Sequence, residues 1–578
     1  MKYFQRVLFT LLCMLLIPAY AVENRLSPLG INTNEIMDID SSVPFIDLFK
    51  MAMPFDEARP WLTKGRITYD QYGWPANLNG GQAGTRFLND FPAESIPKGV
   101  YTVLHDGHGN FRYSGNVRLV RRYSDRDLIE FQPKNGRITA TLIITETDEK
   151  NYLRNFRVIM PGGVCKDNPF QRVSNRSECK GRFYQDFTEN HEALVFNPEY
   201  LNFMKDFRVI RMMNISGITR NNLMNWDQRP KLSDATWGGK EGVRGAPLEI
   251  MIKLANIIDA DPWFSLPHRA TDDFVAQYAR LVKRDLKPSL KAYIEYSNEA
   301  WNGIFTQAHY VKDAGVHFGL DKNRAYAGYK YYSHRSVEIF RIWEQIFGNT
   351  NRLVRVMAGM TTNVPMTHMV LGYEEAFRHV DALAIAPYFH GTQKDIKRIR
   401  SVDQVFNMLN SPKNKYSIPN TMRLVEKQAE VVAQYGIDLI AYEGGQHLVA
   451  YKTHSKTEGS NAFIIAANKD KRMAKLYYDF LSGWKKAGGK LFVAFSAPRE
   501  YSHIGSWGIK EHIAQAMNDA PKYQGLMSFQ KNNRCWWRNC STTGPIARQN
   551  KPRENPGAGE MQRRFKPVKP RVRVAVVN

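Results

Sequence analysis

The chain has 578 residues, of which 43% are hydrophobic and 12% aromatic, so it can bury a large core and is too long for one small domain. This composition excludes an intrinsically disordered chain. The formal charge of +24 favours anionic partners such as acidic polysaccharide, lipid headgroups or nucleic acid.

Residues 1–21 have the pattern of a signal peptide. Lys2 and Arg6 give a positively charged region before an apolar run from Val7 to Pro18, and Ala19-Tyr20-Ala21 offers the small residues of a cleavage site. The run is too short to span a bilayer, although a membrane anchor is the alternative interpretation. No later apolar run reaches the ~20 residues of a membrane helix. We therefore expect a secreted or periplasmic protein, cleaved near Ala21, with no transmembrane segment in the mature chain and no nucleic-acid partner.

Residues 59–156 predict an all-β, sandwich-like accessory module near the N-terminus. Short runs rich in β-branched and aromatic residues follow one another, separated by turn signals such as Asp106-Gly107 and Asn135-Gly136. The runs are Val100–Leu104, Asn116–Val120, Leu128–Phe131 and Ile138–Ile144. Carbohydrate binding and a purely structural role are both open for this module.

From Phe207 onward, short apolar strands alternate with longer helical patterns, and this alternation predicts a parallel sheet. The seven predicted strands are Phe207–Met213, Asp261–Leu266, Leu290–Tyr296, Leu353–Ala358, Val380–Ala386, Ile437–Tyr442 and Lys490–Phe495. We interpret residues 157–530 as a (β/α)8 TIM barrel of the α/β class.

An eighth barrel strand must come from upstream of Phe207. One candidate is Leu29-Gly-Ile-Asn32 within residues 22–58, followed by the helix-like segment Val43–Met53. The other is Arg154–Met160. We favour the first, which would insert the β-rich module between barrel strands 1 and 2.

Four cysteines remain once Cys13 leaves with the signal peptide. An even number in an exported chain indicates two disulfides, and proximity favours Cys165–Cys179 and Cys535–Cys540. A zinc site is the alternative, but neither pair has CxxC spacing, and we expect no metal or cofactor. Residues 531–544 form the segment around the second pair.

Residues 545–578 form a basic tail with nine lysines and arginines against two glutamates, interspersed with prolines. This composition predicts a disordered, solvated extension. The tail is a possible contact for an anionic polymer or surface.

Two glutamates come directly after predicted barrel strands. Glu299 follows Asn298 after the strand that ends at Tyr296, and Glu443 precedes two glycines at the end of another strand. The carboxyl ends of barrel strands carry the active site, and glycosidases use a pair of carboxylates around the scissile bond. On pattern alone, a pair of structural salt-bridge residues is the alternative.

The segment Tyr293-Ile-Glu-Tyr-Ser-Asn-Glu-Ala-Trp-Asn302 resembles the strand-4 motif of clan A glycoside hydrolases, which include family 5. The resemblance covers about Phe207 to Ile513. It implies a retaining hydrolase of β-linkages in which Glu299 is the acid/base and Glu443 the nucleophile. In this scheme Asn298 hydrogen-bonds the sugar.

Other single positions resemble residues that support the catalytic pair in this clan. Arg211 resembles the arginine that steadies the nucleophile, and His268 resembles the strand-3 histidine. Tyr388 resembles the tyrosine that hydrogen-bonds the nucleophile, and Trp507 the tryptophan under the sugar. Trp301 is a weaker candidate, because its aromatic plane would suit a sugar face.

The expected function is an exported retaining β-glycoside hydrolase that acts on a poly- or oligosaccharide by double displacement. Transglycosylation would share its covalent intermediate. The alternative from another class is a non-catalytic carbohydrate-binding or surface protein on a glycosidase-like barrel. The sugar itself depends on long loops, notably Asn214–Ala246 and Gly444–Asn468.

Overall fold

A computed structural model describes residues 23–59, 66–537 and 540. The predicted signal peptide and basic tail lie outside these residues. No helix within them is long and apolar enough to cross a membrane.

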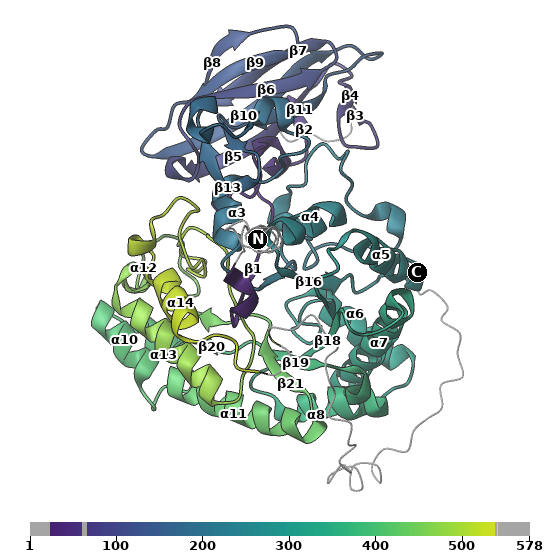
Figure 1. The fold of residues 1–578 in the computed structure, drawn as a ribbon, viewed down its shortest axis with the longest axis vertical. Helices are drawn as coiled ribbons and strands as arrows, with labels where there is room; N and C mark the ends of the chain where they lie inside the picture. Colours follow the sequence, from purple (N-terminus) through teal and green to yellow (C-terminus); the bar gives the residue numbers. More distant parts are fainter. Residues whose placement is uncertain (1–22, 60–65, 538–539, 541–578) are drawn as a thin grey trace, which may run out of the picture.

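Eight parallel strands form a closed barrel, as the alternating pattern predicted (Figure 1). In barrel order the strands are β1 (Leu29–Asn32), β15 (Val209–Arg211), β16 (Asp261–Leu266), β17 (Ala292–Tyr296), β18 (Leu353–Ala358), β19 (Ala382–Ile385), β21 (Asp438–Ala441) and β23 (Phe492–Ala494). Nearly every residue in these strands is buried, because helices cover the outside while side chains fill the inside. The fold is therefore the (β/α)8 barrel expected from the sequence.

The helices lie around the barrel and below the β-rich module in Figure 1. The principal ones are α4 (Leu248–Ile258), α5 (Asp272–Asp285), α6 (Thr306–His317), α7 (Arg324–Phe347), α8 (Val364–Gly372), α10 (Val402–Asn410), α11 (Ile418–Tyr435), α12 (Asn461–Lys469), α13 (Arg472–Lys486) and α14 (Pro521–Asn532). Their buried residues recur at helical spacing, as in α13, where Met473, Leu476, Tyr477, Phe480, Leu481 and Trp484 face inward.

Strand β1 closes the barrel between β15 and β23. Gly30 makes this approach possible, since a Cβ at that position would lie 2.7 Å from the carbonyl oxygen of Val209. The rival strand segment belongs elsewhere: β11 (Arg154–Ile159) pairs with β6 (Val100–Asp106) in the β-rich module. The expected insertion of the module between barrel strands 1 and 2 is thus what the structure shows.

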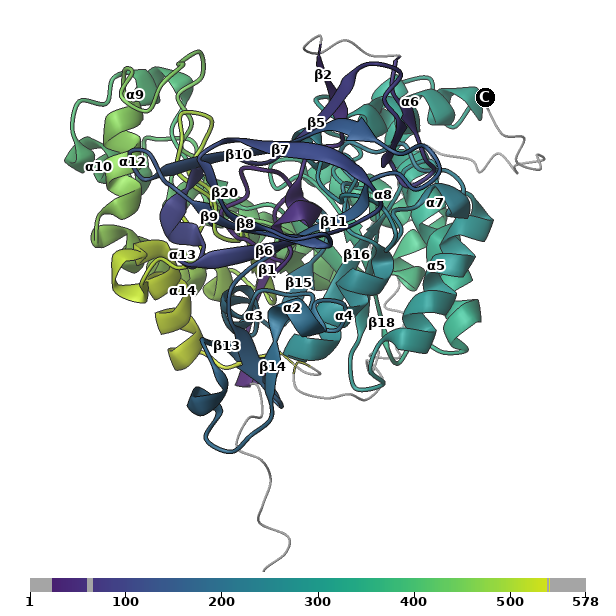
Figure 2. The ribbon, with the colours of Figure 1, turned by 90° about the horizontal axis from the view of Figure 1, so that it is seen from above.

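Two antiparallel four-stranded sheets form most of the module, beside a small two-stranded sheet of β3 (Thr68–Tyr69) and β4 (Pro75–Asn77). The first has the order β2 (Asp56–Arg59), β5 (Gln82–Pro92), β10 (Arg137–Thr147), β7 (Gly109–Gly115), and the second has the order β11, β6, β9 (Arg126–Phe131), β8 (Val117–Arg122). Because the chain leaves the barrel after β1, the module stands at the carboxyl end of the strands. Seen from above, its strands lie over the barrel (Figure 2).

The module also contacts the barrel rim directly. Arg137 on β10 donates two hydrogen bonds of 3.0 Å to Glu500, in the loop after β23. Lys456, from the loop after β21, donates to the same carboxylate at 2.6 Å. These contacts fasten the module to two loops of the barrel's carboxyl end.

The predicted helix Val43–Met53 is wrong. Only a short 3-10 turn, η2 (Leu48–Met51), forms there. Pro44 follows Val43, whose φ of +44° is left-handed, and the side chains of this segment are buried almost without exception. A segment without an exposed polar face does not meet the pattern of a surface helix.

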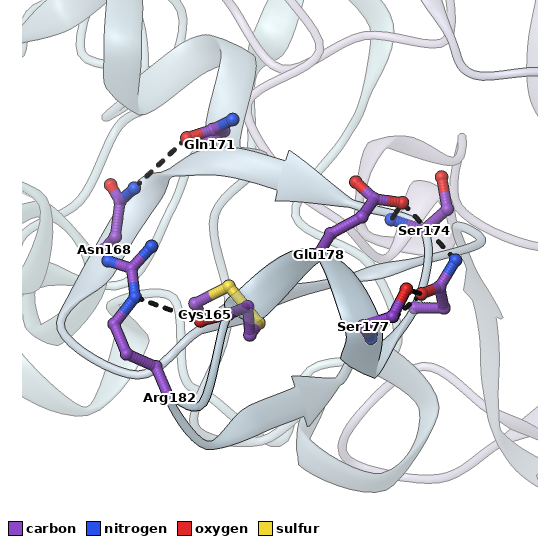
Figure 3. The surroundings of a disulfide bond; sticks show 9 residues. Cys165, Asn168, Gln171, Ser174, Ser177, Glu178 and Arg182 are labelled. Atoms are coloured by element: carbon purple, nitrogen blue, oxygen red, sulfur yellow. Dashed lines mark hydrogen bonds between the residues drawn. A yellow bond between two sulfur atoms is a disulfide. The ribbon is translucent and has the colours of Figure 1, made fainter.

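Both predicted disulfides are present. Cys165–Cys179 has its Cα atoms 5.4 Å apart and Cys535–Cys540 has them 5.9 Å apart. The first lies in a small sheet of β13 (Asn168–Val173), β12 (Gly163–Cys165) and β14 (Tyr184–Asp186), where hydrogen bonds of the neighbouring turns surround it (Figure 3). This sheet follows the module directly and was not predicted from the sequence.

Candidate active site

The turn after β17 carries Glu299 in an unusual backbone conformation. Ser297 has a φ of +62° and Glu299 a φ of +42°, which are left-handed values that cost roughly 1–3 kcal/mol each in a non-glycine residue. The turn is held by the neighbouring backbone: the amide of Ser297 donates to the carbonyl of Leu266 at 2.8 Å, and Gln307 Nε2 donates to the carbonyl of Asn298 at 2.9 Å. Strain of this kind is typical of functional sites.

The carboxylate of Glu299 accepts two hydrogen bonds. Tyr442 Oη donates to Oε1 at 2.6 Å, and Asn302 Nδ2 donates to Oε2 at 2.8 Å. Tyr442 immediately precedes Glu443 in the chain, so the first bond ties the two predicted catalytic residues together across the barrel mouth.

Glu443 follows β21 and is 8% exposed. Its Oε2 lies 3.5 Å from Arg211 Nη1, and it is hydrogen-bonded to Tyr388. Arg211 and Tyr388, the two residues expected beside Glu443, therefore both contact it.

Arg211 is fully buried at the end of β15 and is the centre of a polar network. Its guanidinium makes a two-pronged ion pair with Glu295, with the shortest contact at 2.9 Å. It also donates to Asn32 Oδ1 at 3.1 Å and to Asn298 Oδ1 at 3.0 Å. A single cation thus orients residues from barrel strands 1, 4 and 7.

Electrostatics give the two glutamates different characters. Burial, together with the nearby charge of Glu299, raises the pKa of Glu443, whereas Arg211 and the Tyr388 hydroxyl act to lower it. Among the described residues Glu443 has an ion pair with Arg211, and no ion pair joins a cation to Glu299. The charge of Arg211 thus favours the ionised form of Glu443 and opposes the effect of burial.

Aromatic side chains line the site next to Glu443. Strands β20 (Tyr388–Phe389) and β22 (Gly445–Gln446) pair side by side at the barrel mouth. The ring of His447 lies 5.3 Å from that of Tyr388 and 5.6 Å from that of Trp507. Trp507 is half-buried, and its Nε1 donates to His447 Nδ1 at 3.1 Å.

Among the described residues, the side chains of His268 and Trp301 form no hydrogen bond with this polar centre. His268 follows β16 and is buried against Tyr310, and burial lowers its pKa to about 4, which leaves the ring neutral. Trp301 is 8% exposed and packs edge-on against Tyr332 at 5.6 Å, so its ring belongs to the hydrophobic core rather than to an open surface.

Sequence reasoning missed several residues of the site. Glu295 had a signal, because a glutamate within an otherwise apolar strand needs a buried partner. Asn32 ends the strand β1, and its Nδ2 donates to the carbonyl of Tyr442 at 3.0 Å. His447 lies in a long loop, where no local pattern indicates its position.

Within the described residues, no group of three or more His, Cys, Asp or Glu side chains could hold a metal ion.

No protein-family model and no curated protein matches the sequence. Solved structures with a similar fold include a 4-O-α-L-rhamnosyl-β-D-glucuronidase from Fusarium oxysporum (TM-score 0.33, 12% identity, 56% of this chain and 61% of that one). An endo-β-1,4-mannanase from Cellulomonas fimi has a TM-score of 0.31 and 12% identity, over 56% of this chain and 62% of that one. A broad-specificity endoglucanase from Clostridium longisporum has a TM-score of 0.34 and 10% identity, over 65% of this chain and 96% of that one. The chain thus spans less than two thirds of the first two, and scores this low carry no argument about function.

Proposed function

We propose that the protein is an exported, retaining β-glycoside hydrolase with Glu299 as acid/base and Glu443 as nucleophile. The observation that carries the proposal is the asymmetric carboxylate pair at the barrel mouth. The two residues are linked through Tyr442, and Glu443 alone of the two is paired with the buried cation Arg211. A retaining glycosidase needs this asymmetry, with one carboxylic acid and one carboxylate at the same sugar.

The reaction proceeds by two displacements. Glu299 donates its proton to the glycosidic oxygen while Glu443 attacks the anomeric carbon, and the bond to the leaving group breaks. Glu299 then takes a proton from water, whose oxygen attacks the same carbon and releases Glu443. Arg211 holds Glu443 in place, and Asn298, which it also contacts, is positioned beside the acid to hydrogen-bond the sugar.

The substrate class is a β-linked poly- or oligosaccharide met outside the cell. Export rests on the signal-peptide pattern of residues 1–21 and is compatible with the two disulfides. The long loops after β15 and β21 and the attached β-rich module border the same end of the barrel, where an extended sugar chain would lie.

The test is reducing-sugar release from a panel of β-glucans, mannans and xylans, together with the matching aryl β-glycosides. Glu443→Gln serves as the control, because it preserves the shape of the side chain and removes the nucleophilic charge. Release by the wild type that falls by several orders of magnitude in the control supports the proposal. Equal release by both proteins, or none by the wild type on any substrate, contradicts it.

A further inference from the structure

Two histidines lie on the same face of the β20–β22 ladder as Tyr388. Tyr388 pairs with Gly445 and Phe389 with Gln446, and the amide of His447 continues the ladder by donating to the carbonyl of Phe389 at 3.0 Å. Because side chains alternate along a strand, His390 lies on the face of Tyr388, and His447 on the same face of the neighbouring strand. The His390 and His447 rings are 5.7 Å apart.

The tautomer of His447 follows from its contact with Trp507. An indole nitrogen can only donate, so His447 Nδ1, 3.1 Å from Trp507 Nε1, must accept and carries no proton. Burial lowers the pKa of His447 to about 4, so the ring is neutral at ordinary pH. Its one proton is then on Nε2, which is a hydrogen-bond donor.

His390 has the opposite tautomer. Its Nδ1 lies 2.8 Å from the carbonyl oxygen of Gly391, which can only accept, so Nδ1 carries the proton. Burial lowers the pKa of His390 as well, and Nε2 of the neutral ring is an acceptor. The ring stacks on Tyr416, with centroids 4.2 Å apart and planes inclined by 16°, which holds its orientation.

These rings therefore present one donor and one acceptor side by side. In the part of the chain that the structure describes, neither Nε2 makes a hydrogen bond. Tyr388 contacts Glu443, and two residues along a strand correspond to about 6.6 Å, so the pair lies within reach of a sugar held at Glu443. A hydroxyl group can accept from one nitrogen and donate to the other, whereas a carboxylate can only accept and would face the lone pair of His390.

We propose that His390 and His447 form a donor–acceptor pair that selects an uncharged sugar unit by its hydroxyl groups beside Glu443. The inference rests on the proposed glycosidase function and names the chemistry of the unit bound there. It differs from the expectation drawn from net charge alone, because the basic character of the chain favours acidic polymers whereas this part of the site favours hydroxyls.

Paired variants of each histidine distinguish the contribution of Nδ1 from that of Nε2. In His447→Asn the amide oxygen can still accept from Trp507, but the donor at the position of Nε2 is lost; His447→Gln places an amide near that position. In His390→Asn the amide nitrogen can still donate to the carbonyl of Gly391, but the acceptor at the position of Nε2 is lost; His390→Gln places an amide oxygen near that position. Circular dichroism and the thermal midpoint of each full-length variant check that it is folded.

Each protein is assayed with the neutral aryl β-glycoside that the substrate panel identifies and with its monodeoxy analogues. Loss of a neutral hydrogen bond predicts a decrease in kcat/KM of about 3- to 10-fold in each Asn variant, with partial recovery in the Gln variants. One deoxy position should lower the wild-type value by a similar factor and have little further effect in the Asn variants, because the partner is already gone. The corresponding uronide should be a poorer substrate than the neutral glycoside.

The inference is overturned if both Asn variants of an active enzyme stay within twofold of the wild type. It is also overturned if the deoxy penalties are independent of the histidines, or if the uronide is the better substrate. These failures differ from failure of the proposed function, in which the wild type itself hydrolyses no glycoside and both proposals fall.

Discussion

Tyr442 Oη donates a 2.6 Å hydrogen bond to Glu299, while the next residue in the chain is Glu443. Tyr442 therefore sets the position of Glu299 relative to Glu443. Its ring also lies 4.9 Å from the guanidinium of Arg211, so it contacts the cation that supports Glu443. The loops after β17 and β21 are consequently coupled.

Tyr442→Phe should decrease kcat by about 10- to 100-fold and leave the fold intact, because it removes a hydrogen bond to the carboxylate that forms when Glu299 donates its proton. The measurement is kcat and the thermal midpoint. Tyr101→Phe is the matched control, because Tyr101 is also buried and donates one 2.6 Å hydrogen bond, to the carbonyl of Pro97, but lies in the β-rich module. Similar kcat values for Tyr442→Phe and the wild type would contradict a role in positioning Glu299.

Tyr388→Phe should move the acidic limb of the pH profile of kcat/KM to higher pH. The Tyr388 hydroxyl stabilises the ionised form of Glu443 and so lowers its pKa. Removing that hydrogen bond raises the pKa, and the nucleophile is then ionised only at higher pH. A limb that stays in place or moves to lower pH would show that the hydroxyl does not interact with the ionised nucleophile.

Arg211→Met should destabilise the protein by about 3–5 kcal/mol, because it leaves the carboxylate of Glu295 buried without its cation. Glu295→Gln in the same chain should recover part of that loss, since no uncompensated charge remains. Urea unfolding of the single and double variants measures both values. The double variant should still lack activity, because Glu443 has lost its ion pair. A double variant less stable than Arg211→Met would contradict this account of the pair.

The barrel was predictable because its strands and helices leave local patterns. The predicted strands Asp261–Leu266 and Leu353–Ala358 match the structure residue by residue. The sequence also placed Arg211 and Tyr388 near Glu443 through the resemblance. The network of Asn32, Glu295 and Tyr442 was not predictable, because it joins strands that are far apart in sequence. The helix predicted at Val43–Met53 was wrong for a related reason. The apolar residues of this segment are buried between module and barrel, where tertiary contacts override local helical preference.

Replacing Cys165 and Cys179 together by serine should lower the free energy of unfolding by about 3 kcal/mol, on the loop-entropy relation for a separation of 14 residues. The double replacement avoids a free thiol. Cys535→Ser with Cys540→Ser is the comparison, and its separation of 5 residues predicts about 2 kcal/mol. Activity should be unchanged in the first pair, because the small β12–β14 sheet contributes no residue to the site. Mass spectrometry of the wild type that finds four free thiols would contradict both bridges.

Glycosyl azide formation tests the roles of the two glutamates most directly. Glu443→Ala removes the nucleophile and leaves the acid, so azide can attack the anomeric carbon of an activated β-glycoside from the vacated face. That single displacement should give an α-glycosyl azide. Glu299→Ala still forms the glycosyl-enzyme from a substrate with a good leaving group, and azide then intercepts it to give a β-glycosyl azide.

Proton NMR of the azide products reads the anomeric configuration and thereby assigns each residue. We expect the α product from Glu443→Ala and the β product from Glu299→Ala. Without azide, the activity of Glu443→Ala should be lower than that of the wild type by several orders of magnitude. The reverse pair of products would exchange the two roles, and full activity in both variants would show that these glutamates are not the catalytic pair.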